Sequence, residues 1–400
     1  MSKTYPRRPS NILYIDHTAE LGGGEIALLN AITHLRPEKV SPHVLLFSEG
    51  PLIERLQGVS PTTVFPLEAH IRRYSKDAIG WHLLLQIRDI FRVLGMAFRV
   101  ARFARRMKVD IIHTNSLKAD FIGGVAGRIA GIPVVWHVRD RIDAAYLPGQ
   151  AISMIHYFAN ILPTYVISNS NATLETIHLK PGKPCRAIAS GYYDRHSGSG
   201  TDVAVESPGV ALKGENSPLR IGLIGRIAEW KGQHVFIDAA KQVLSQHRNV
   251  QFEIIGSSLF GESEYEQSLH EQCARLGVED AILFKGFVSK IHEYIRELDI
   301  IVHASTSGEP FGQVLVEGMA AEKPVIATRG GAVPEIVLDG ETGLLVPMGD
   351  SKAMASAIEY LIAHPEEACE MGKKGRQRVL KCFTIEQTAR AFEAVYDEIL

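Results

Sequence analysis

The chain alternates short apolar runs with longer amphipathic stretches, and it does so in two successive series. Each interval between apolar runs is long enough to hold a helix, so each series predicts a parallel sheet covered by helices. The pattern therefore predicts an α/β fold with two doubly wound, Rossmann-like domains. We expect strands at 11–15, 44–47, 110–113, 134–137 and 165–168, and then at 220–224, 251–255, 282–284, 300–303, 324–327 and 343–346.

The stretch 197–217 separates the two series. It is rich in Gly and Ser and lacks periodicity, which is typical of a linker or mobile loop. A length of 400 residues also exceeds what one hydrophobic core usually holds. We expect an N-terminal domain over 1–196, a C-terminal domain over 218–383 and a last helix over 384–400. Two such domains would hold a ligand in the cleft between them.

Cysteine spacing and hydropathy bear on the location of the protein. The four cysteines form no CxxC pair and no metal-like spacing, which favours reduced thiols in a cytoplasmic protein. The apolar run at 12–15 is too short for a signal peptide, and no uncharged apolar stretch is long enough to span a membrane.

Basic residues are concentrated at 71–108. This segment has ten Lys and Arg against two Asp, a net charge of +8, although the whole chain carries −2. Apolar residues interleave with the bases at helical spacing, so 81–108 predicts a basic amphipathic helix. One interpretation is a peripheral helix on an anionic membrane surface, or one that binds an anionic acceptor. The other is a helix that packs its apolar face on its own domain and leaves the bases in solvent.

Two carboxylates, Glu309 and Glu317, lie eight positions apart. The first is in a loop with Pro310 and Gly312, and the second is in an apolar run that predicts a helix. Eight residues of helix would separate them by roughly 12 Å, whereas paired glycosidase carboxylates need roughly 5 to 9.5 Å. We therefore interpret them as acceptors for different hydroxyl groups of one ligand. The helix start between them favours a phosphate, and together these features indicate a nucleotide sugar.

Arg226 and Lys231 follow the strand expected at 220–224. A guanidinium fork and an ammonium group five residues apart suit a diphosphate, although a loop Arg and Lys can also be ordinary surface residues. A second anion-friendly feature in the same domain, the helix start after Phe311, favours the diphosphate.

The segment Gly22-Gly23-Gly24-Glu25 formally matches a dinucleotide-binding fingerprint. However, six residues separate it from the preceding strand, and Glu25 would bring a negative charge to the place of the pyrophosphate. We favour a flexible glycine loop near a second ligand.

Histidines end three of the expected strands. His113 and His137 end neighbouring strands at one sheet edge, so His137 is either a packed ring or a site residue, whereas we interpret His303 as structural. The segment 330–335 predicts a turn into a short helix. This turn either lies near the cleft or has no role beyond being a turn. The sequence has no Walker A loop, HExxH, G-x-S-x-G or Asp-x-Asp motif, so we expect no metal and assign charge neutralisation to the two cations and the helix start.

Together, Gly22–Glu25, Gly225-Arg226, Lys231, the Glu309-x7-Glu317 segment and the 330–335 turn resemble the retaining glycosyltransferases of family 4, which have the GT-B fold. The likeness covers nearly the whole chain in the right order. It implies that Arg226 and Lys231 bind the donor diphosphate, that Glu309 faces the donor sugar and that Glu317 holds the ribose. It also implies phosphate contacts near Gly225 and after Phe311 (Gly312, Gln313, Val314), His137 near the sugar, Gly22–Gly24 near acceptor and phosphate, and a final helix crossing back to the first domain. Two departures are Gly191-Tyr192-Tyr193-Asp194 in place of an Asn-Gly-x-Asp turn, and Trp230 where Glu is common.

The resulting hypothesis is a metal-independent, anomer-retaining hexosyltransferase of polysaccharide biosynthesis. It would use a UDP- or GDP-sugar as substrate, need no cofactor and no nucleic acid, and transfer to a hydroxyl acceptor that is a glycan, a lipid-linked sugar or a small molecule. The alternatives are a GT-B-fold nucleotide-sugar epimerase, a non-catalytic nucleotide- or carbohydrate-binding protein, and an NAD-dependent dehydrogenase using the glycine segment.

Overall fold

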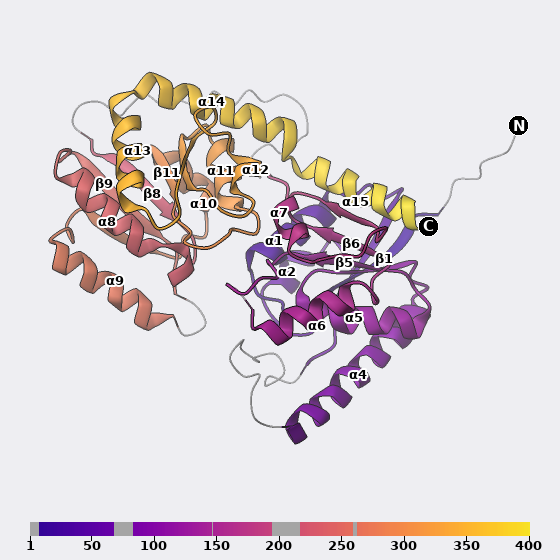
Figure 1. Cartoon of the computed structure of the whole chain (residues 1–400). Helices are drawn as coiled ribbons and strands as arrows, with labels where there is room; N and C mark the ends of the chain where they lie inside the picture. The colour runs from indigo at the N-terminus through magenta and orange to yellow at the C-terminus, as the bar shows by residue number, and fades with distance from the viewer. Residues whose placement is uncertain (1–7, 68–82, 146, 194–216, 259–261) are drawn as a thin grey trace, which may run out of the picture. The chain divides into compact units, whose positions relative to one another are not determined.

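The computed structural model describes residues 8–67, 83–145, 147–193, 217–258 and 262–400. The chain divides into two compact units, one formed by Met1–Gly191 with Ile385–Leu400 and the other by Tyr192–Thr384 (Figure 1). Each unit has its own parallel sheet and its own buried apolar core. Most of the segment expected as a linker, 197–216, lies outside the described residues.

The first unit contains a parallel sheet in the order β3-β2-β1-β4-β5-β6-β7. The five predicted strands are present within a few residues of their expected ends. The three-residue strands β3 and β7 were not predicted, because they are too short to show a period. The strands are β1 (Ser10–Asp16), β2 (Val40–Leu46), β3 (Thr62–Val64), β4 (Ile111–Thr114), β5 (Val134–Val138), β6 (Tyr165–Ser168) and β7 (Cys185–Ala187), and the helices are α1 (Gly23–Thr33), α2 (Leu52–Leu56), α4 (Leu83–Arg106), α5 (Leu117–Ala130), α6 (Gly149–Ala159), α7 (Asn171–Glu175) and α15 (Ile385–Ile399).

The second unit contains a parallel sheet in the order β10-β9-β8-β11-β12-β13, and all six of its strands were predicted. The strands are β8 (Leu219–Ile224), β9 (Val250–Ile255), β10 (Ile282–Gly286), β11 (Ile300–His303), β12 (Val325–Thr328) and β13 (Leu344–Val346). The helices are η1 (Glu229–Lys231, a 3-10 turn), α8 (Gln233–Leu244), α9 (Ser263–Leu276), α10 (Ile291–Glu297), α11 (Gln313–Ala320), α12 (Val333–Ile336), α13 (Ser351–Ala363) and α14 (Pro365–Cys382).

The last helix, α15, packs on the first unit, although α14 just before it belongs to the second. Its buried face carries Phe392 and Tyr396, each 1% exposed. The carboxylate of Glu393, also buried, accepts hydrogen bonds from the backbone N and the guanidinium of Arg36 and from Arg390. Apolar burial and ion pairs to the buried carboxylate of Glu393 thus hold the end of the chain on the N-terminal sheet.

Within the described residues, no helix combines the length and the hydropathy needed to cross a bilayer.

Candidate active site

The C-terminal sheet reverses its strand order between β8 and β11. In sheets of this kind, ligands bind beyond the carboxyl ends of the strands at the reversal point. β8 leads to the turn that carries Lys231, and β11 leads to the loop that carries Glu309. The fold therefore brings two predicted site residues to the place that favours a ligand.

Lys231 and Glu309 form an ion pair at this reversal point. Nζ of Lys231 lies 3.1 Å from Oε1 and 2.9 Å from Oε2 of Glu309. Nε2 of His303 and Oγ of Ser305 each lie 3.0 Å from Oε2. Burial alone would raise the pKa of Glu309, but the charge of Lys231 and the hydrogen bond to His303 hold it well below its ordinary value. We call Lys231, His303, Ser305 and Glu309 the Lys231 cluster.

The hydrogen-bonding capacity of the Lys231 cluster is partly used. Oε2 of Glu309 has three partners, whereas Oε1 has only Lys231 within the described residues. An ammonium group has three N–H donors, and two of them are directed at Glu309. One acceptor position on Oε1 and one donor on Nζ therefore remain for a ligand. Because Glu309 is held as an anion, it cannot serve as a general acid near neutral pH.

His303 was not among the site residues that the sequence predicted. It was expected to be structural, but its ring contacts the carboxylate of Glu309 directly. Its position at the end of β11, six residues before Glu309, was the available signal.

Trp230 confines Lys231 on another side. Nζ lies 4.1 Å from the centroid of the indole ring, which is a cation–π contact. The departure from the family pattern at position 230 thus supplies a second contact that restrains the ammonium group.

The 330–335 turn packs against the backbone of Glu309. Gly331 has φ +58°, and a Cβ there would lie 2.2 Å from the carbonyl oxygen of Glu309. Ala332 N donates to that same oxygen at 2.9 Å. Only glycine allows this close approach of two backbones, so the turn is part of the scaffold of the site.

α11 begins at Gln313, which confirms the helix start predicted after Phe311 but corrects the distance argument. Gly312, at φ 104°, precedes the helix, so only five of the residues from Glu309 to Glu317 are helical. The estimate of roughly 12 Å assumed a continuous helix and does not apply, because Pro310 and Gly312 prevent one. The loop position of Glu309 and the helical position of Glu317 are confirmed.

The start of α11 offers backbone donors close to the Lys231 cluster in sequence. Gln313 and Val314 occupy the first two helical positions, whose N–H groups have no intrahelical acceptor. Phe311 is 6% exposed and packs on Phe383, so its ring belongs to the core.

Arg226, directly after Gly225, pairs with a different carboxylate from Lys231. Its Nε lies 3.4 Å from Oε2 of Glu262, and a third of its side chain is exposed. The two cations therefore lie on the same β8–α8 connection but contact different acids.

The N-terminal sheet reverses its order between β1 and β4, and a second polar cluster lies there. Asp16 is fully buried and accepts hydrogen bonds from Asn115 Nδ2 at 2.6 Å and Ser116 Oγ at 2.9 Å. His17 Nδ1 lies 3.1 Å from Oδ1 of Asp16. Burial would raise the pKa of Asp16, but the hydrogen bonds from His17, Asn115 and Ser116 lower it below its ordinary value. We call these four residues the Asp16 cluster; none of them was predicted as a site residue.

The glycine segment is not the flexible loop that the sequence suggested. α1 begins at Gly23, so Gly23 and Gly24 are its first residues, and Gly22 is the N-cap, whose carbonyl accepts from Ile26 N at 3.0 Å. Glycine is a good N-cap residue, which explains why the helix starts within the segment. Burial and the neighbouring charge of Asp16 raise the pKa of Glu25 to about 7.

His137 lies in a buried hydrogen-bonded chain with the last helix. Its Nδ1 is 3.2 Å from Nε2 of His113 and 3.5 Å from the guanidinium of Arg139, and its ring packs against Phe392. Nδ1 of His113 in turn contacts the hydroxyl of Tyr396 at 2.6 Å. Burial and the charge of Arg139 lower the pKa of His113 to about 3 and that of His137 well below its ordinary value. Both rings are therefore neutral near pH 7.

The proton on His137 can be assigned from its neighbours. A guanidinium only donates, so Nδ1 of His137 carries the lone pair and Nε2 carries the proton. Nε2 is buried and has no hydrogen-bond partner among the described residues. An unpartnered buried N–H costs about 1 to 3 kcal/mol, so this edge of the ring is suited to donate to a ligand oxygen.

Three side chains at the Asp16 cluster, those of Asp16, His17 and Glu25, are of the types that ligate metals. Ligand atoms of Asp16, His17 and Glu25 lie within 4.8 Å of one another. Both oxygens of Asp16 already accept hydrogen bonds, however, and one of these donors is Nδ1 of His17. The arrangement fits a hydrogen-bonded polar cluster better than a ligand set.

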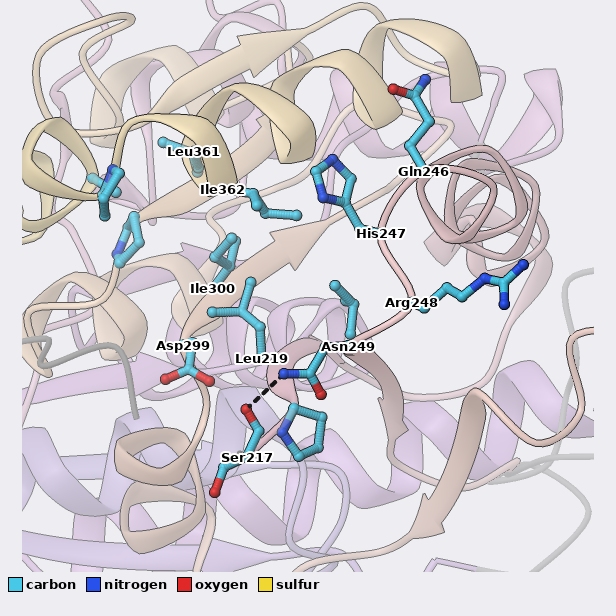
Figure 2. A pocket seen from close by; sticks show the side chains of 15 residues that line it. Ser217, Leu219, Gln246, His247, Arg248, Asn249, Asp299, Ile300, Leu361 and Ile362 are labelled. Carbon is cyan, nitrogen blue, oxygen red and sulfur yellow. Dashed lines mark hydrogen bonds between the residues drawn. The ribbon is translucent and has the colours of Figure 1, made fainter. Parts of the chain in front are cut away.

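A cavity of about 420 Å³ lies at the other edge of the C-terminal sheet, bordered by the first residues of β8, β9 and β11: Leu219, Val250 and Ile300 (Figure 2). None of the predicted donor-binding residues lines it. The cavity thus lies at the amino-terminal ends of β8 and β11, opposite the carboxyl ends that lead to the Lys231 cluster.

Known structures and sequences agree with this two-domain arrangement. The crystal structure of Anabaena HepE in complex with UDP-glucose is similar at a TM-score of 0.80 and 26% identity, covering 98% of this chain and 100% of that one. The complex of HepE with UDP and glucose gives a TM-score of 0.79, also at 26% identity, covering 96% and 99%. The chain has the GT-B fold. Residues 21–191 match the Glycosyltransferase Family 4 model, and residues 212–378 match the model described as glycosyl transferases group 1.

Curated relatives share part of this chain. The lipopolysaccharide core biosynthesis mannosyltransferase LpcC of Rhizobium leguminosarum bv. viciae is 31% identical over 50% of this chain and 58% of its own length. The lipopolysaccharide core biosynthesis mannosyltransferase LpsB of Rhizobium meliloti (strain 1021) is 34% identical over 45% of this chain and 52% of its own length. The chain thus spans about half the length of these relatives.

Proposed function

We propose that this protein is a glycosyltransferase that moves a sugar from a nucleotide-diphosphate donor to a hydroxyl group. The observation that carries the proposal is the Lys231 cluster at the reversal point of the C-terminal sheet. A buried ion pair there leaves one cationic N–H donor and one carboxylate acceptor available, and α11 begins four residues after Glu309. This combination suits a diphosphate next to hydroxyl groups.

The cluster suggests how the donor reacts. Negative charge builds on the leaving phosphate in the transition state, and a fixed cation stabilises it without reorganisation. Glu309 and Trp230 restrain Lys231, so its remaining N–H is already placed when the donor binds. Arg226 supplies the second cation. In this proposal the amides of Gln313 and Val314 add phosphate contacts, Glu317 binds the ribose, and His137 donates from Nε2 to the sugar.

We further propose that the transfer retains the anomeric configuration, needs no metal and moves a hexose. Glu309 is already committed to Lys231, which argues against its use as a covalent nucleophile. We infer retention with the leaving phosphate oxygen taking the acceptor proton, and a hexose as the transferred group. The two cations would neutralise the diphosphate without a metal. Product analysis tests this: an altered sugar still attached to its nucleotide would indicate an epimerase instead.

The similarity to HepE bound to UDP-glucose supports a UDP-sugar donor, and the relatives named for lipopolysaccharide core biosynthesis support a polysaccharide or lipid-linked acceptor. The decisive experiment is a thermal-shift panel of UDP, GDP, ADP and their sugars, followed by donor turnover with the ligand that stabilises most. No stabilisation by any nucleotide would refute the proposal.

We further propose that α4 holds the protein on an anionic membrane surface. Its buried face, with Met96 and Val100, packs on the domain, but Phe91 and Phe98 on the other face are 69% and 59% exposed. Arg102 and Arg106 are exposed on the same helix. The two interpretations of the basic segment therefore both describe real faces of α4: one packs on the domain, and the other is apolar, basic and accessible.

A further inference from the structure

The ring of His17 is anchored through one nitrogen in the Asp16 cluster. Nδ1 lies 3.1 Å from Oδ1 of Asp16 and 2.8 Å from Oγ of Ser116. The hydroxyl proton of Ser116 is directed at Oδ1 of Asp16, at 2.9 Å, so Ser116 presents a lone pair to the ring. Both neighbours of Nδ1 are therefore acceptors. The neutral ring must carry its proton on Nδ1 and its lone pair on Nε2.

The other nitrogen of His17 is available. No hydrogen bond reaches Nε2 from the described residues, and 28% of the side chain is exposed. A carboxylate oxygen of Glu25 lies within 4.8 Å of a ring nitrogen of His17. Glu25 gains a proton more easily than an ordinary glutamate, since its carboxyl group is buried beside the charge of Asp16. The protonated form of Glu25 donates a hydrogen bond, so a donor group lies within 4.8 Å of a nitrogen of the His17 ring.

The position of this pair within the fold is that of a ligand site. Asp16 and His17 follow β1, and Asn115 and Ser116 follow β4, the two strands between which the N-terminal sheet reverses its order. The Lys231 cluster occupies the equivalent position in the C-terminal sheet. Each sheet therefore has a polar cluster at the point where such sheets bind ligands, and the donor accounts for only one of them.

We propose that Nε2 of His17, oriented by Asp16 and Ser116, accepts a hydrogen bond from a hydroxyl group of the sugar acceptor, while the carboxyl group of Glu25 donates to that hydroxyl. A neutral hydroxyl group uses one donor and one acceptor, which this pair supplies, whereas an anion would be repelled by Asp16. The acceptor role rests on the proposed transferase function; the hydroxyl-binding site itself does not. His17 binds and positions the ligand, and no proton transfer to it is required.

The first experiment needs no donor. Nitrogen-15 NMR of histidine-labelled full-length protein should show His17 with its proton on Nδ1, the signal being assigned by its loss in His17→Asn. Titration with methyl α-D-glucopyranoside should shift the Nε2 resonance of His17 and leave that of His43, bonded to Thr63 on β3, unchanged. A proton on Nε2, or no shift of His17 up to saturating sugar, would overturn the proposal.

The second experiment separates acceptor binding from donor binding. The His17→Asn variant keeps an N–H near Asp16 but lacks the distal nitrogen. With UDP-glucose as donor, its KM for methyl α-D-glucopyranoside should rise on the order of tenfold, as expected for one lost hydrogen bond. The Kd for UDP should not change, and the His43→Asn control should alter neither value.

An unchanged KM in His17→Asn, or an equal loss of UDP affinity, would contradict the assignment. Where that variant does not fold, Ser116→Ala removes one of the two anchors of the ring and should raise the same KM. If the wild-type protein transfers from no nucleotide sugar, the transferase proposal fails, and the sugar titration still decides the role of His17.

Discussion

At the scale of single residues, the chemistry depends on buried groups whose protonation is set by their partners. Glu309 stays ionised because Lys231 and His303 outweigh the cost of burial. Burial and the charge of Asp16 raise the pKa of Glu25 to about 7, because they outweigh the opposing charge of Arg139. The two glutamates thus differ in charge state near neutral pH, for reasons that lie largely in their neighbours.

Replacing either cation next to the proposed donor should slow turnover. We expect Lys231→Ala or Arg226→Ala to lower kcat with the best nucleotide sugar by on the order of 10² or more, since a fixed charge at the transition state is lost. Steady-state kinetics measures this, with Lys241→Ala on α8 as the control. Near-normal turnover in Lys231→Ala would refute the assigned role.

Glu25 should make stability fall as pH rises. Its pKa is higher in the folded than in the unfolded chain, so the folded state binds more protons between about pH 4.5 and 7, and the free energy of unfolding decreases across that range. Glu25→Gln removes this loss and should raise Tm above wild type at pH 8, with less difference at pH 5. Thermal unfolding at both pH values tests it; Glu20→Gln, at an exposed site, should match wild type. A lower Tm for Glu25→Gln at pH 8 would contradict the prediction.

At the scale of elements, α4 and α15 differ in how much of their apolar surface they bury. α4 buries one face and leaves Phe91, Leu94 and Phe98 exposed on another. α15 buries Phe392 and Tyr396 beneath it and connects to His113 through the hydroxyl of Tyr396. Both were predicted as helices, and α4 also as an amphipathic one, but only packing shows which apolar residues each helix leaves in solvent.

The exposed face of α4 should bind anionic vesicles. The wild-type protein should co-sediment with vesicles containing phosphatidylglycerol and detach at raised salt, because basic residues contribute to the attraction. Phe91→Ser with Phe98→Ser should lower the partition coefficient at least about tenfold, given the apolar burial lost. Phe287→Ser, at a 75% exposed site in the other unit, is the control. Equal binding of wild type and the double variant would end the proposal.

α15 should contribute strongly to the stability of the first unit. Phe392 is 1% exposed and packs on His113 and His137, so Phe392→Ala should cost about 3 to 5 kcal/mol through lost burial and a cavity. Urea unfolding followed by hydrogen exchange of the N-terminal sheet measures the loss. Leu380→Ala, at a 53% exposed site on α14, should change little. A similarly small effect at Phe392 would show that α15 is only loosely attached.

At the scale of the whole molecule, two sheets with separate cores share the same arrangement of strands and polar residues. Each reverses its order between its first strand and the first strand added on the other side, β1 and β4 or β8 and β11. Each places buried charged residues just beyond that reversal. The proposed division of labour, with the donor on the second unit and the acceptor on the first, follows from the different chemistry of the two clusters.

Separate cores should give separately stabilised units. Because the proposed donor site lies in the unit Tyr192–Thr384, UDP at about 100 times its Kd should stabilise that unit by about 2.7 kcal/mol and the other unit less. Calorimetry together with hydrogen exchange of each sheet distinguishes the two. Equal stabilisation of both would contradict a donor site confined to the second unit.

The sequence by itself determined the two α/β domains and nearly all strands, and it singled out Lys231 and Glu309 as candidate site residues. These depend on hydrophobic periodicity and on residue types at strand ends, which are local properties. Only the tertiary structure decided that Lys231 and Glu309 are partners although 78 positions apart, that His303 joins them, and that Ser116, 99 positions after His17, orients its ring. Such contacts depend on which strands become neighbours in a sheet. Because the crossover helices bring distant strand ends to one edge, the partners become visible only when the strand order is known.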